Sequence, residues 1–334
     1  MYNSPGFLGT PVTHQIRTFI AGAFCVAAFN SFAAYPEKPI TIIAPYPAGG
    51  STDIVARLLA PMLAERLKQT VVVENAAGAG GSIGALRVVK AAPDGYTILL
   101  GSGSEVVINK MINPAVTYDG LKDLAPVAMI GTSPMVLLGK SQLPASNVSE
   151  LLALGRAKPG QLNYATAGNG TLMHLTGEML KMRADVQLTH VPYRGSPPAL
   201  NDLMGGQVDL AISTLSAAQG AIQSGKVKVF AVTSKTPSAL APQVPALGMV
   251  SGLEGFDVEV WFGLFMPVKT PSAIVKLVEE ATLQLLNDPA LKKRLAEQGV
   301  IAAGSSAEEL RKFLSAEVEK FHTIVKAAKI TAGP

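Results

Sequence analysis

The chain has 334 residues, of which 48% are hydrophobic and only 16% are charged. This length accommodates two ordinary domains or one large one, and the high apolar content excludes an intrinsically disordered chain. The 28 basic and 24 acidic residues give a formal net charge of +4 without a basic cluster, so we expect no nucleic-acid partner.

Residues 1–33 have the layout of a secretory signal peptide. Arg17 precedes a short apolar run, and the small residues Ser31 and Ala33 stand at positions −3 and −1 of a cleavage site after Ala33. The run is shorter than the roughly 18 residues that a membrane-spanning helix requires. We therefore predict export with cleavage near Ala33. Cleavage also removes Cys25, the only cysteine, which excludes disulfides, thiol catalysis and thiolate metal sites from the mature chain.

After Pro39, short apolar runs alternate with segments of helical periodicity. Strands are expected at residues 40–44, 71–73, 97–100, 124–130, 135–139, 162–165, 187–191, 208–212, 227–232 and 259–267. Helices are expected at residues 51–67, 81–90, 147–158, 171–182 and 197–204, and the remainder from Pro271 onward is expected to be helical. Pro61 should kink or divide the first helix, since it lacks an amide donor. This alternation predicts an α/β fold with a largely parallel sheet.

The two strand–helix series, with a helical tail that returns to the first, predict two lobes joined by at least two crossings. We place one lobe at residues 34–132 and 258–334, and the other at residues 133–257. A cleft between two such lobes is the expected ligand site.

Two glycine-containing turns, one in each predicted lobe, are candidate anion sites. Residues 46–53 and 168–171 each follow a strand and open a helix, where free backbone amides face outward at the positive end of the helix dipole. Glycine lets a ligand approach the backbone closely. Together the turns could grip a carboxylate from both sides. For the first turn, the alternative is a tight turn in which Asp53 caps the helix, although Asp53 could also meet a ligand amine.

Other motifs indicate different chemistry but fail in detail. The glycines at 78–84 do not fit the dinucleotide spacing, and residues 139–141 lack the first glycine of a P-loop. Residues 80–84 satisfy the GxSxG pattern of serine hydrolases, yet Ser82 does not directly follow a strand. A secreted hydrolase that uses Ser82 with one of the downstream histidines remains the alternative enzyme. The four histidines show no metal-ligand spacing, so we expect no metal and no cofactor.

Several single side chains are candidates for the walls of the cleft. His174 lies one turn into its helix and could reach the cleft, or it could simply be packed or exposed. Tyr46, Tyr193 and Trp261 are either ligand walls or core residues. Arg194 could bind a carboxylate bidentately, or it could be an ordinary surface residue in a turn.

In order along the mature chain, these segments resemble the receptors of tripartite tricarboxylate transporters, often called the Bug family. The segments that carry the resemblance are residues 38–53, 73–75, 93–96, 162–165, 190–195, 205–209 and 261–264. The resemblance implies a two-lobed type II periplasmic binding protein fold. It also implies a periplasmic, monomeric receptor, not an enzyme, which passes a small carboxylate to a two-component membrane permease. A receptor that presents its ligand to a membrane sensor kinase is a further alternative.

The resemblance also implies a set of ligand-binding residues, because members of the family clasp a carboxylate through amides, hydroxyls and ordered waters of the two turns. With the wall at residues 101–105 and the far end of the cleft, the residues implied here are Tyr46, Ala48, Gly49, Gly50, Ser51, Thr52, Asp53, Ser104, Glu105, Gly168, Asn169, Gly170, Thr171, His174, Tyr193 and Ser213. Many relatives carry a small hydroxyl residue in place of Glu105, and they often have Asp in place of Ser213. Glu105 is either a partner of a helix dipole or a contact for a positive or hydrogen-donating ligand group.

Overall fold

The computed structural model describes residues 35–327 and Ile330. The predicted signal peptide and its cleavage site lie outside these residues. None of the helices in the described part of the chain is both long and apolar enough to cross a membrane.

The described strands form one mixed sheet, in the order β2-β1-β3-β9-β4-β7-β5-β6, with β8 and β10 paired to β4. Their bounds are β1 Ile40–Ala44, β2 Val71–Asn75, β3 Thr97–Ser102, β4 Leu124–Lys140, β5 Asn163–Thr166, β6 Thr189–Pro192, β7 Leu210–Thr214, β8 Val227–Val232, β9 Glu259–Pro267 and β10 Ile301–Ser306. Pairing is parallel among β1, β2 and β3 and among β5, β6 and β7, but every pair that involves β4 or β9 is antiparallel. The prediction of a largely parallel sheet is therefore wrong at the centre of the sheet.

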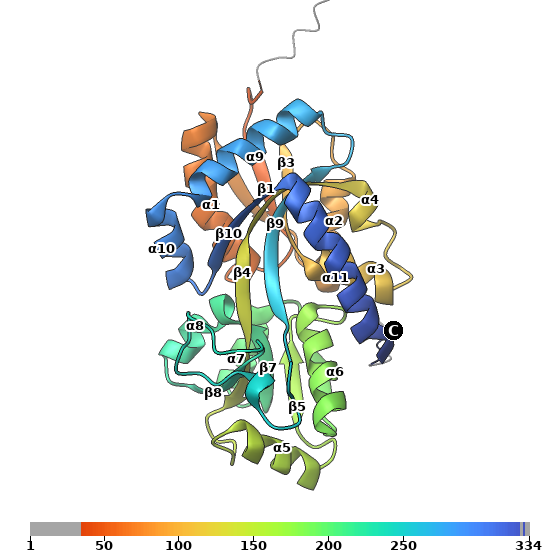
Figure 1. Ribbon diagram of the computed structural model, residues 1–334, viewed down its shortest axis with the longest axis vertical. Helices are drawn as coiled ribbons and strands as arrows, with labels where there is room; N and C mark the ends of the chain where they lie inside the picture. The colour runs from red at the N-terminus through yellow and green to blue at the C-terminus, as the bar shows by residue number, and fades with distance from the viewer. Residues whose placement is uncertain (1–34, 328–329, 331–334) are drawn as a thin grey trace, which may run out of the picture. The chain divides into compact units, whose positions relative to one another are not determined.

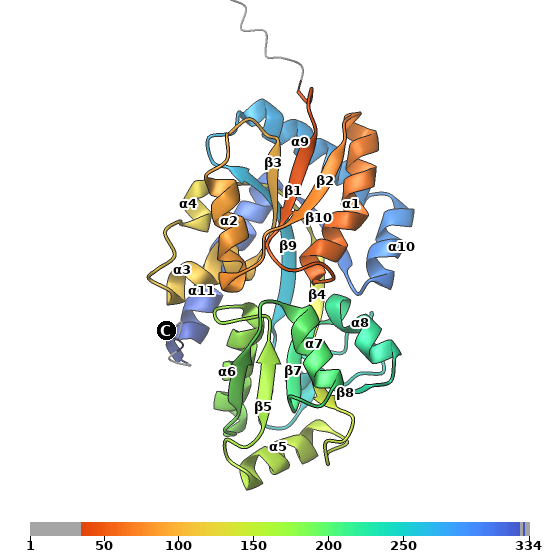
Figure 2. The same cartoon turned by 180° about the vertical axis from the view of Figure 1, so that it is seen from behind.

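Helices surround both halves of this sheet (Figures 1 and 2). Their bounds are α1 Ser51–Leu67, α2 Ser82–Val89, α3 Asn109–Ile112, α4 Gly120–Asp123, α5 Val148–Ala157, α6 Leu172–Ala184, α7 Ser196–Met204, α8 Leu215–Gln223, α9 Ser272–Leu286, α10 Pro289–Glu297 and α11 Ala307–Ala327. A π-helix, Ser104–Ile108, leads into α3, and short 3-10 turns occur at Ala79–Gly81 and Leu247–Met249.

The long strand β4 and its neighbour β9 connect the two lobes. The first lobe carries β1–β3, β10, α1–α4 and α9–α11, and the second carries β5–β8 and α5–α8; in Figure 1 these occupy the upper and lower halves of the ribbon. The chain passes to the second lobe through β4 and returns through β9. Of the predicted lobe boundaries, the one after Thr132 lies inside β4, and the one before Val258 directly precedes β9. These boundaries stay a prediction.

Four local expectations are corrected by the structure. The segment 131–134 was expected to separate two strands, but it remains extended, because Ser133 and Pro134 pair with the first residues of β9. Helix α1 runs through Pro61 without a break, and Pro61 is exposed, so water can reach the carbonyl group that loses its partner. The C-terminal remainder is not all helical, because β10 pairs with β4, and α8 was not expected.

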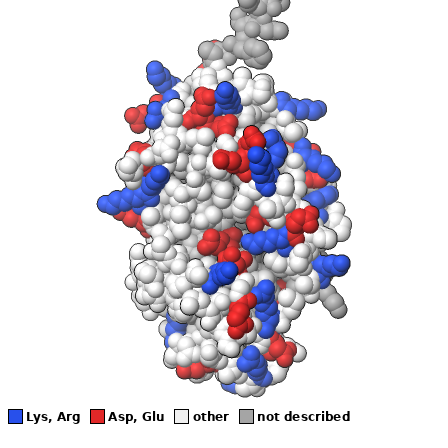
Figure 3. Space-filling model, viewed as in Figure 1, with Lys and Arg blue, Asp and Glu red and all other residues white. Residues whose placement is uncertain are grey.

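Charged side chains of both signs are interspersed over the face shown in Figure 3. Apolar side chains of β4, β7, α7 and α8 form the core of the second lobe. In the first lobe, the indole of the buried Trp261 donates a hydrogen bond to Glu317 Oε2 of α11 at 3.0 Å.

Candidate ligand-binding site

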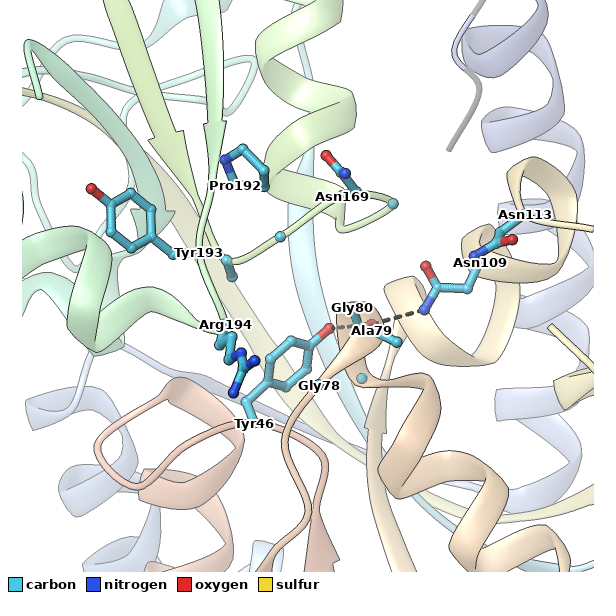
Figure 4. A pocket seen from close by; sticks show the side chains of 14 residues that line it. Tyr46, Gly78, Ala79, Gly80, Asn109, Asn113, Asn169, Pro192, Tyr193 and Arg194 are labelled. Atoms are coloured by element: carbon cyan, nitrogen blue, oxygen red, sulfur yellow. Dashed lines mark hydrogen bonds between the residues drawn. The ribbon is translucent and has the colours of Figure 1, made fainter. Parts of the chain in front are cut away.

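Two cavities adjoin the same two residues, Tyr46 and Ala167, between the lobes. The smaller, which we call the inner cavity, encloses about 10 Å³, enough for about one water molecule. It is lined by Tyr46, Gly50, Ser51, Thr52, Ser102, Ser104, Ala167, Met173, Ser196 and Val260. The larger, which we call the outer cavity, encloses about 290 Å³ (Figure 4). It is lined by Tyr46, Gly78, Ala79, Gly80, Gly81, Asn109, Asn113, Ala167, Gly168, Asn169, Gly170, Pro192, Tyr193 and Arg194.

The turn between β1 and α1 directs the start of α1 at the inner cavity. Gly50 is the N-cap residue, so the amides of the first turn of α1 have no partner within the helix. Asp53 stabilises the turn from behind: its carboxylate accepts hydrogen bonds from the Gly49 amide, Arg57 Nε and Asn75 Nδ2, all at 2.9 Å. Burial opposes ionisation, but these three donors hold the pKa of Asp53 below its ordinary value. Asp53 is thus fully occupied by protein partners.

A buried acid lies one layer behind the inner cavity. Glu105 is 1% exposed and accepts hydrogen bonds from the Ser102 amide and, at 2.9 Å, from Ser102 Oγ. The hydroxyl of Tyr46 lies 3.1 Å from Glu105 Oε2 and 3.0 Å from the carbonyl oxygen of Gly80. Burial raises the pKa of Glu105 to about 7, although its hydrogen bonds act in the opposite direction.

The turn between β5 and α6 belongs to the second lobe and contacts the first lobe. Thr171 caps α6: its Oγ1 accepts from the His174 amide at 3.3 Å and donates to the Gly168 carbonyl at 2.7 Å. The next amide, of Leu172, donates to Ser104 Oγ of the first lobe at 3.0 Å. The structure therefore has the two lobes in direct contact at this turn.

His174 lines neither cavity. Its ring stacks on the ring of His190 with a centroid distance of 4.1 Å, and Nδ1 lies 3.4 Å from the Gly170 amide. Burial lowers the pKa of His174, and burial with the neighbouring His174 lowers the pKa of His190 to about 3. Both rings are therefore neutral at neutral pH.

The structure brings nine of the sixteen residues implied by the resemblance to the two cavities. Those nine are Tyr46, Gly50, Ser51, Thr52, Ser104, Gly168, Asn169, Gly170 and Tyr193. The other seven, Ala48, Gly49, Asp53, Glu105, Thr171, His174 and Ser213, line neither cavity. Ser213 is buried in β7, and Tyr193, although it lines the outer cavity, donates its hydroxyl hydrogen to Asp202 at 2.6 Å. Among the described residues, no group of three or more His, Cys, Asp or Glu side chains could hold a metal ion.

The profile of the tripartite tricarboxylate transporter family receptor matches residues 55–330 of the sequence. The chain belongs to this receptor family. BugT of Bordetella pertussis is 36% identical over 312 residues, which cover 93% of this chain and 95% of BugT. The resemblance noted in the sequence is thereby confirmed.

Two solved structures confirm the two-lobed type II binding protein fold. A protein of R. palustris with adipate has a TM-score of 0.86 at 31% identity, and covers 89% of this chain and 99% of its own. MatC of Rhodopseudomonas palustris with bound malate has a TM-score of 0.82 at 32% identity, and covers 87% of this chain and 100% of its own. Receptors of this family bind solutes, and the structural neighbours are periplasmic binding proteins.

Several residues that line the cavities were not predicted from the sequence. Ser196 begins α7 after Gly195, so the turn between β6 and α7 repeats the strand–glycine–helix layout of the two predicted turns. That signal was available in the sequence. For the glycines at 78–84 the sequence suggested a dinucleotide motif, and for residues 80–84 the GxSxG pattern of a serine hydrolase. Their actual role is close approach: a Cβ atom at Gly80 would lie 2.7 Å from the Asn169 carbonyl oxygen of the second lobe.

Ser102 lies in the wall that was expected at residues 101–105, whereas Met173 and Val260 had no local signal. These three residues come from β3, α6 and β9, and only the tertiary fold brings them together. Asn109 donates to the Gly80 carbonyl and to Ser82 Oγ, both at 2.8 Å. The described hydrogen-bond partners of Ser82 Oγ are thus the side-chain amide of Asn109 and the hydroxyl of Tyr118, and neither is a histidine.

Proposed function

We propose that this chain is a non-enzymatic periplasmic receptor that closes its two lobes on a small carboxylated molecule and delivers it to a two-component membrane permease. The observation that carries the proposal is the hydroxyl of Thr52. It is 1% exposed, it lines the inner cavity, and it has no hydrogen-bond partner among the described residues.

An unpaired buried hydroxyl costs about 1–3 kcal/mol, so its presence in a cavity points to a ligand that would satisfy it. Thr52 belongs to the first turn of α1, and Ser196 begins α7, so two helix N-termini meet the same cavity. The free amides of the first turn of α1, the amide of Ser196 and the hydroxyls around them favour an anion, whereas Pro197 and Pro198 of α7 carry no N–H. The residues that line the inner cavity carry no formal charge, so the recognition would rest on hydrogen bonds.

The ligands of the structural neighbours support the carboxylate class. Adipate and malate, named in two relatives at 31% and 32% identity, are both dicarboxylates. In this chain Arg194 is the charged residue in the lining of the outer cavity, and a guanidinium can bind a carboxylate through two parallel hydrogen bonds. We therefore propose that a second carboxylate, where the ligand has one, lies in the outer cavity.

A thermal-shift and calorimetric screen of the mature protein against mono-, di- and tricarboxylates tests the proposal. A ligand at about 100 times its Kd should stabilise the protein by about 2.7 kcal/mol. Thr52→Val should keep or raise the stability of the free protein, because it removes the unpaired hydroxyl, and should weaken carboxylate binding about tenfold.

Thr270→Val is the matched control. Thr270 Oγ1 is also buried without a partner among the described residues, but Thr270 lines neither cavity. This substitution should leave affinity unchanged. The proposal is wrong if no carboxylate shifts the melting temperature, or if Thr52→Val binds as tightly as the wild type. Loss of ligand uptake in cells that lack the receptor tests delivery to a permease.

A further inference from the structure

We infer that Glu105, although it touches neither cavity, makes the inner cavity select carboxylates that carry a hydrogen-bond donor, an ammonium or a hydroxyl group, on the carbon next to the carboxylate. The inference rests on the proposed function and deepens it to a class of ligand. Glu105 acts through Ser102 and Tyr46, and is therefore a positioning residue.

Glu105 fixes the direction of the Ser102 hydroxyl. Ser102 Oγ donates its hydrogen to Glu105 Oε2 at 2.9 Å, while Oε1 accepts the Ser102 amide. A serine hydroxyl has one hydrogen and two acceptor lone pairs. Because the hydrogen is turned toward Glu105, Ser102 presents only lone pairs to the inner cavity that it lines.

The hydroxyl of Tyr46, like that of Ser102, directs its hydrogen away from the cavity. Its oxygen is 3.0 Å from the Gly80 carbonyl and 3.1 Å from Glu105 Oε2, and both of these atoms can accept its single hydrogen. In either arrangement the hydrogen is directed into the protein. Tyr46, which lines both cavities, therefore offers a ligand an acceptor and not a donor.

Other groups of the inner cavity have the opposite polarity. The Thr52 hydroxyl has no acceptor among the described residues, so its hydrogen is available to a ligand, whereas Ser104 Oγ accepts the Leu172 amide and is also hydrogen-bonded to the Tyr46 hydroxyl. With the first-turn amides of α1, the Thr52 hydroxyl supplies donors for a carboxylate. The inner cavity thus combines donors for an anion with acceptors for a neighbouring donor group. This pattern matches a 2-amino or 2-hydroxy acid better than a 2-oxo acid.

The charge of Glu105 favours the ammonium over the hydroxyl. The titratable groups that face Glu105 are Tyr46 and Tyr118. The hydroxyl of Tyr118 donates to the backbone carbonyl oxygen of Glu105 at 2.6 Å. No described cation is bonded to the Glu105 carboxylate. A ligand ammonium would supply the missing positive charge. Because burial raises the pKa of Glu105 to about 7, the preference should strengthen from pH 6 to pH 8, as the carboxylate loses its proton.

Glu105, Ser102, Tyr46 and Gly80 all belong to the first lobe. The inner cavity encloses only about 10 Å³, so a ligand can enter only when the lobes separate. These four residues are linked by hydrogen bonds and move together with the first lobe, so Ser102 and Tyr46 still present acceptors to the ligand while the site is open. Selection of the ligand by these residues therefore precedes closure.

Glu105→Gln is the direct test. The Gln oxygen must keep the Ser102 amide, so the NH2 group takes the place of Oε2 and donates to Ser102 Oγ or Tyr46, and the Ser102 hydrogen can then turn into the cavity. Affinities are measured by calorimetry at pH 8 for L-glutamate, 2-hydroxyglutarate, 2-oxoglutarate and glutarate, and for alanine, lactate, pyruvate and propionate. The wild type should prefer the amino form, then the hydroxy form, and Glu105→Gln should reduce the ratio of amino to oxo affinity about tenfold.

Two further variants separate this role from a structural one. Ser102→Ala should reduce the same ratio, and adding Glu105→Gln to it should have little further effect, because both act on one hydroxyl. Glu317→Gln is the control, since Glu317 is also buried and hydrogen-bonded, to Trp261, but lines neither cavity; it should leave the ratio unchanged. The inference is overturned if the wild type binds oxo or unsubstituted acids as tightly as amino and hydroxy acids, or if Glu105→Gln keeps the ratio. If no carboxylate of either series binds the wild type, the proposed function fails as well.

Discussion

Ser104 Oγ of the first lobe accepts a hydrogen bond of 3.0 Å from the Leu172 amide of the second. Leu172 is the first residue of α6, so the Leu172 amide has no partner within the helix. In the open receptor this amide would meet water, and in the closed one it meets Ser104. The contact therefore contributes to the free energy of closure as well as to the lining of the inner cavity.

Ser104→Ala should shift the receptor toward the open state. The closed form would bury the Leu172 amide without an acceptor, which costs about 1–3 kcal/mol. Since apparent affinity scales with the population of the closed state, ligand affinity should fall about tenfold. Small-angle scattering should show a larger radius of gyration for the ligand-free variant. Ser216→Ala removes a buried hydroxyl whose hydrogen-bond partner among the described residues is Thr214 of the same lobe, and should change neither quantity.

Gly170→Ala should block closure by steric conflict. Gly170 has φ +78°, and a Cβ atom there would lie 2.5 Å from Oδ1 of Asn109, a first-lobe residue whose amide is held by Gly80 and Ser82. Affinity should fall at least tenfold, and stability by about 1–2 kcal/mol for the left-handed backbone.

Gly160→Ala isolates the steric effect of that substitution. Gly160 has φ +72°, but beyond its chain neighbours no atom of the described residues lies within 4 Å of the Cβ position, so this variant has the backbone strain without the contact between lobes. It should lose similar stability and keep its affinity. Equal affinities of the two variants by calorimetry would contradict the steric explanation.

Local signals in the sequence predicted the parts of the fold that local interactions determine. The sequence has the pattern of a capping box at residues 147–150 and 306–309, and the structure has reciprocal hydrogen bonds between Asn147 and Glu150 and between Ser306 and Glu309. Strands β1, β8 and β9 occur at their predicted bounds. In these segments the propensities agree with the tertiary environment.

Elements defined by pairing with distant segments could not be predicted in this way. The segment 131–134 has the composition of a turn, yet β9 holds it in β4, and β10 has few β-branched residues and exists through its pairing with β4. The site shows the same limit. The sequence identified the glycine turns, but the position of Glu105 behind Ser102 and Tyr46 depends on how three segments pack.

The stacked histidines should make the protein less stable in acid. Because burial and His174 lower the pKa of His190 to about 3, the unfolded chain takes up a proton near pH 6.5 that the folded chain refuses. The free energy of unfolding should therefore fall as pH falls below 6.5. His190→Gln should reduce that loss between pH 6.5 and 5 by about 1 kcal/mol, after allowance for partial exposure. Urea denaturation measures the difference, and His322→Gln, on the exposed side of α11, should leave it unchanged.

Glu105 should give the free energy of unfolding the opposite dependence on pH. Its pKa is raised by burial from 4.5 to about 7, so between these pH values the folded chain holds a proton that the unfolded chain has lost. The free energy of unfolding of the wild type should fall as pH rises through this window, whereas Gln at position 105 does not titrate. The stability of Glu105→Gln relative to the wild type should therefore rise by about 2–3 kcal/mol between pH 5 and 8, measured by urea denaturation. For Glu178→Gln the difference should be flat over the same range, because hydrogen bonds from Lys181 and Tyr164 outweigh burial and hold the pKa of Glu178 below 4.5. A flat difference for Glu105→Gln would show that the carboxylate is already ionised at pH 5, and that the polarity of Ser102 does not change with pH.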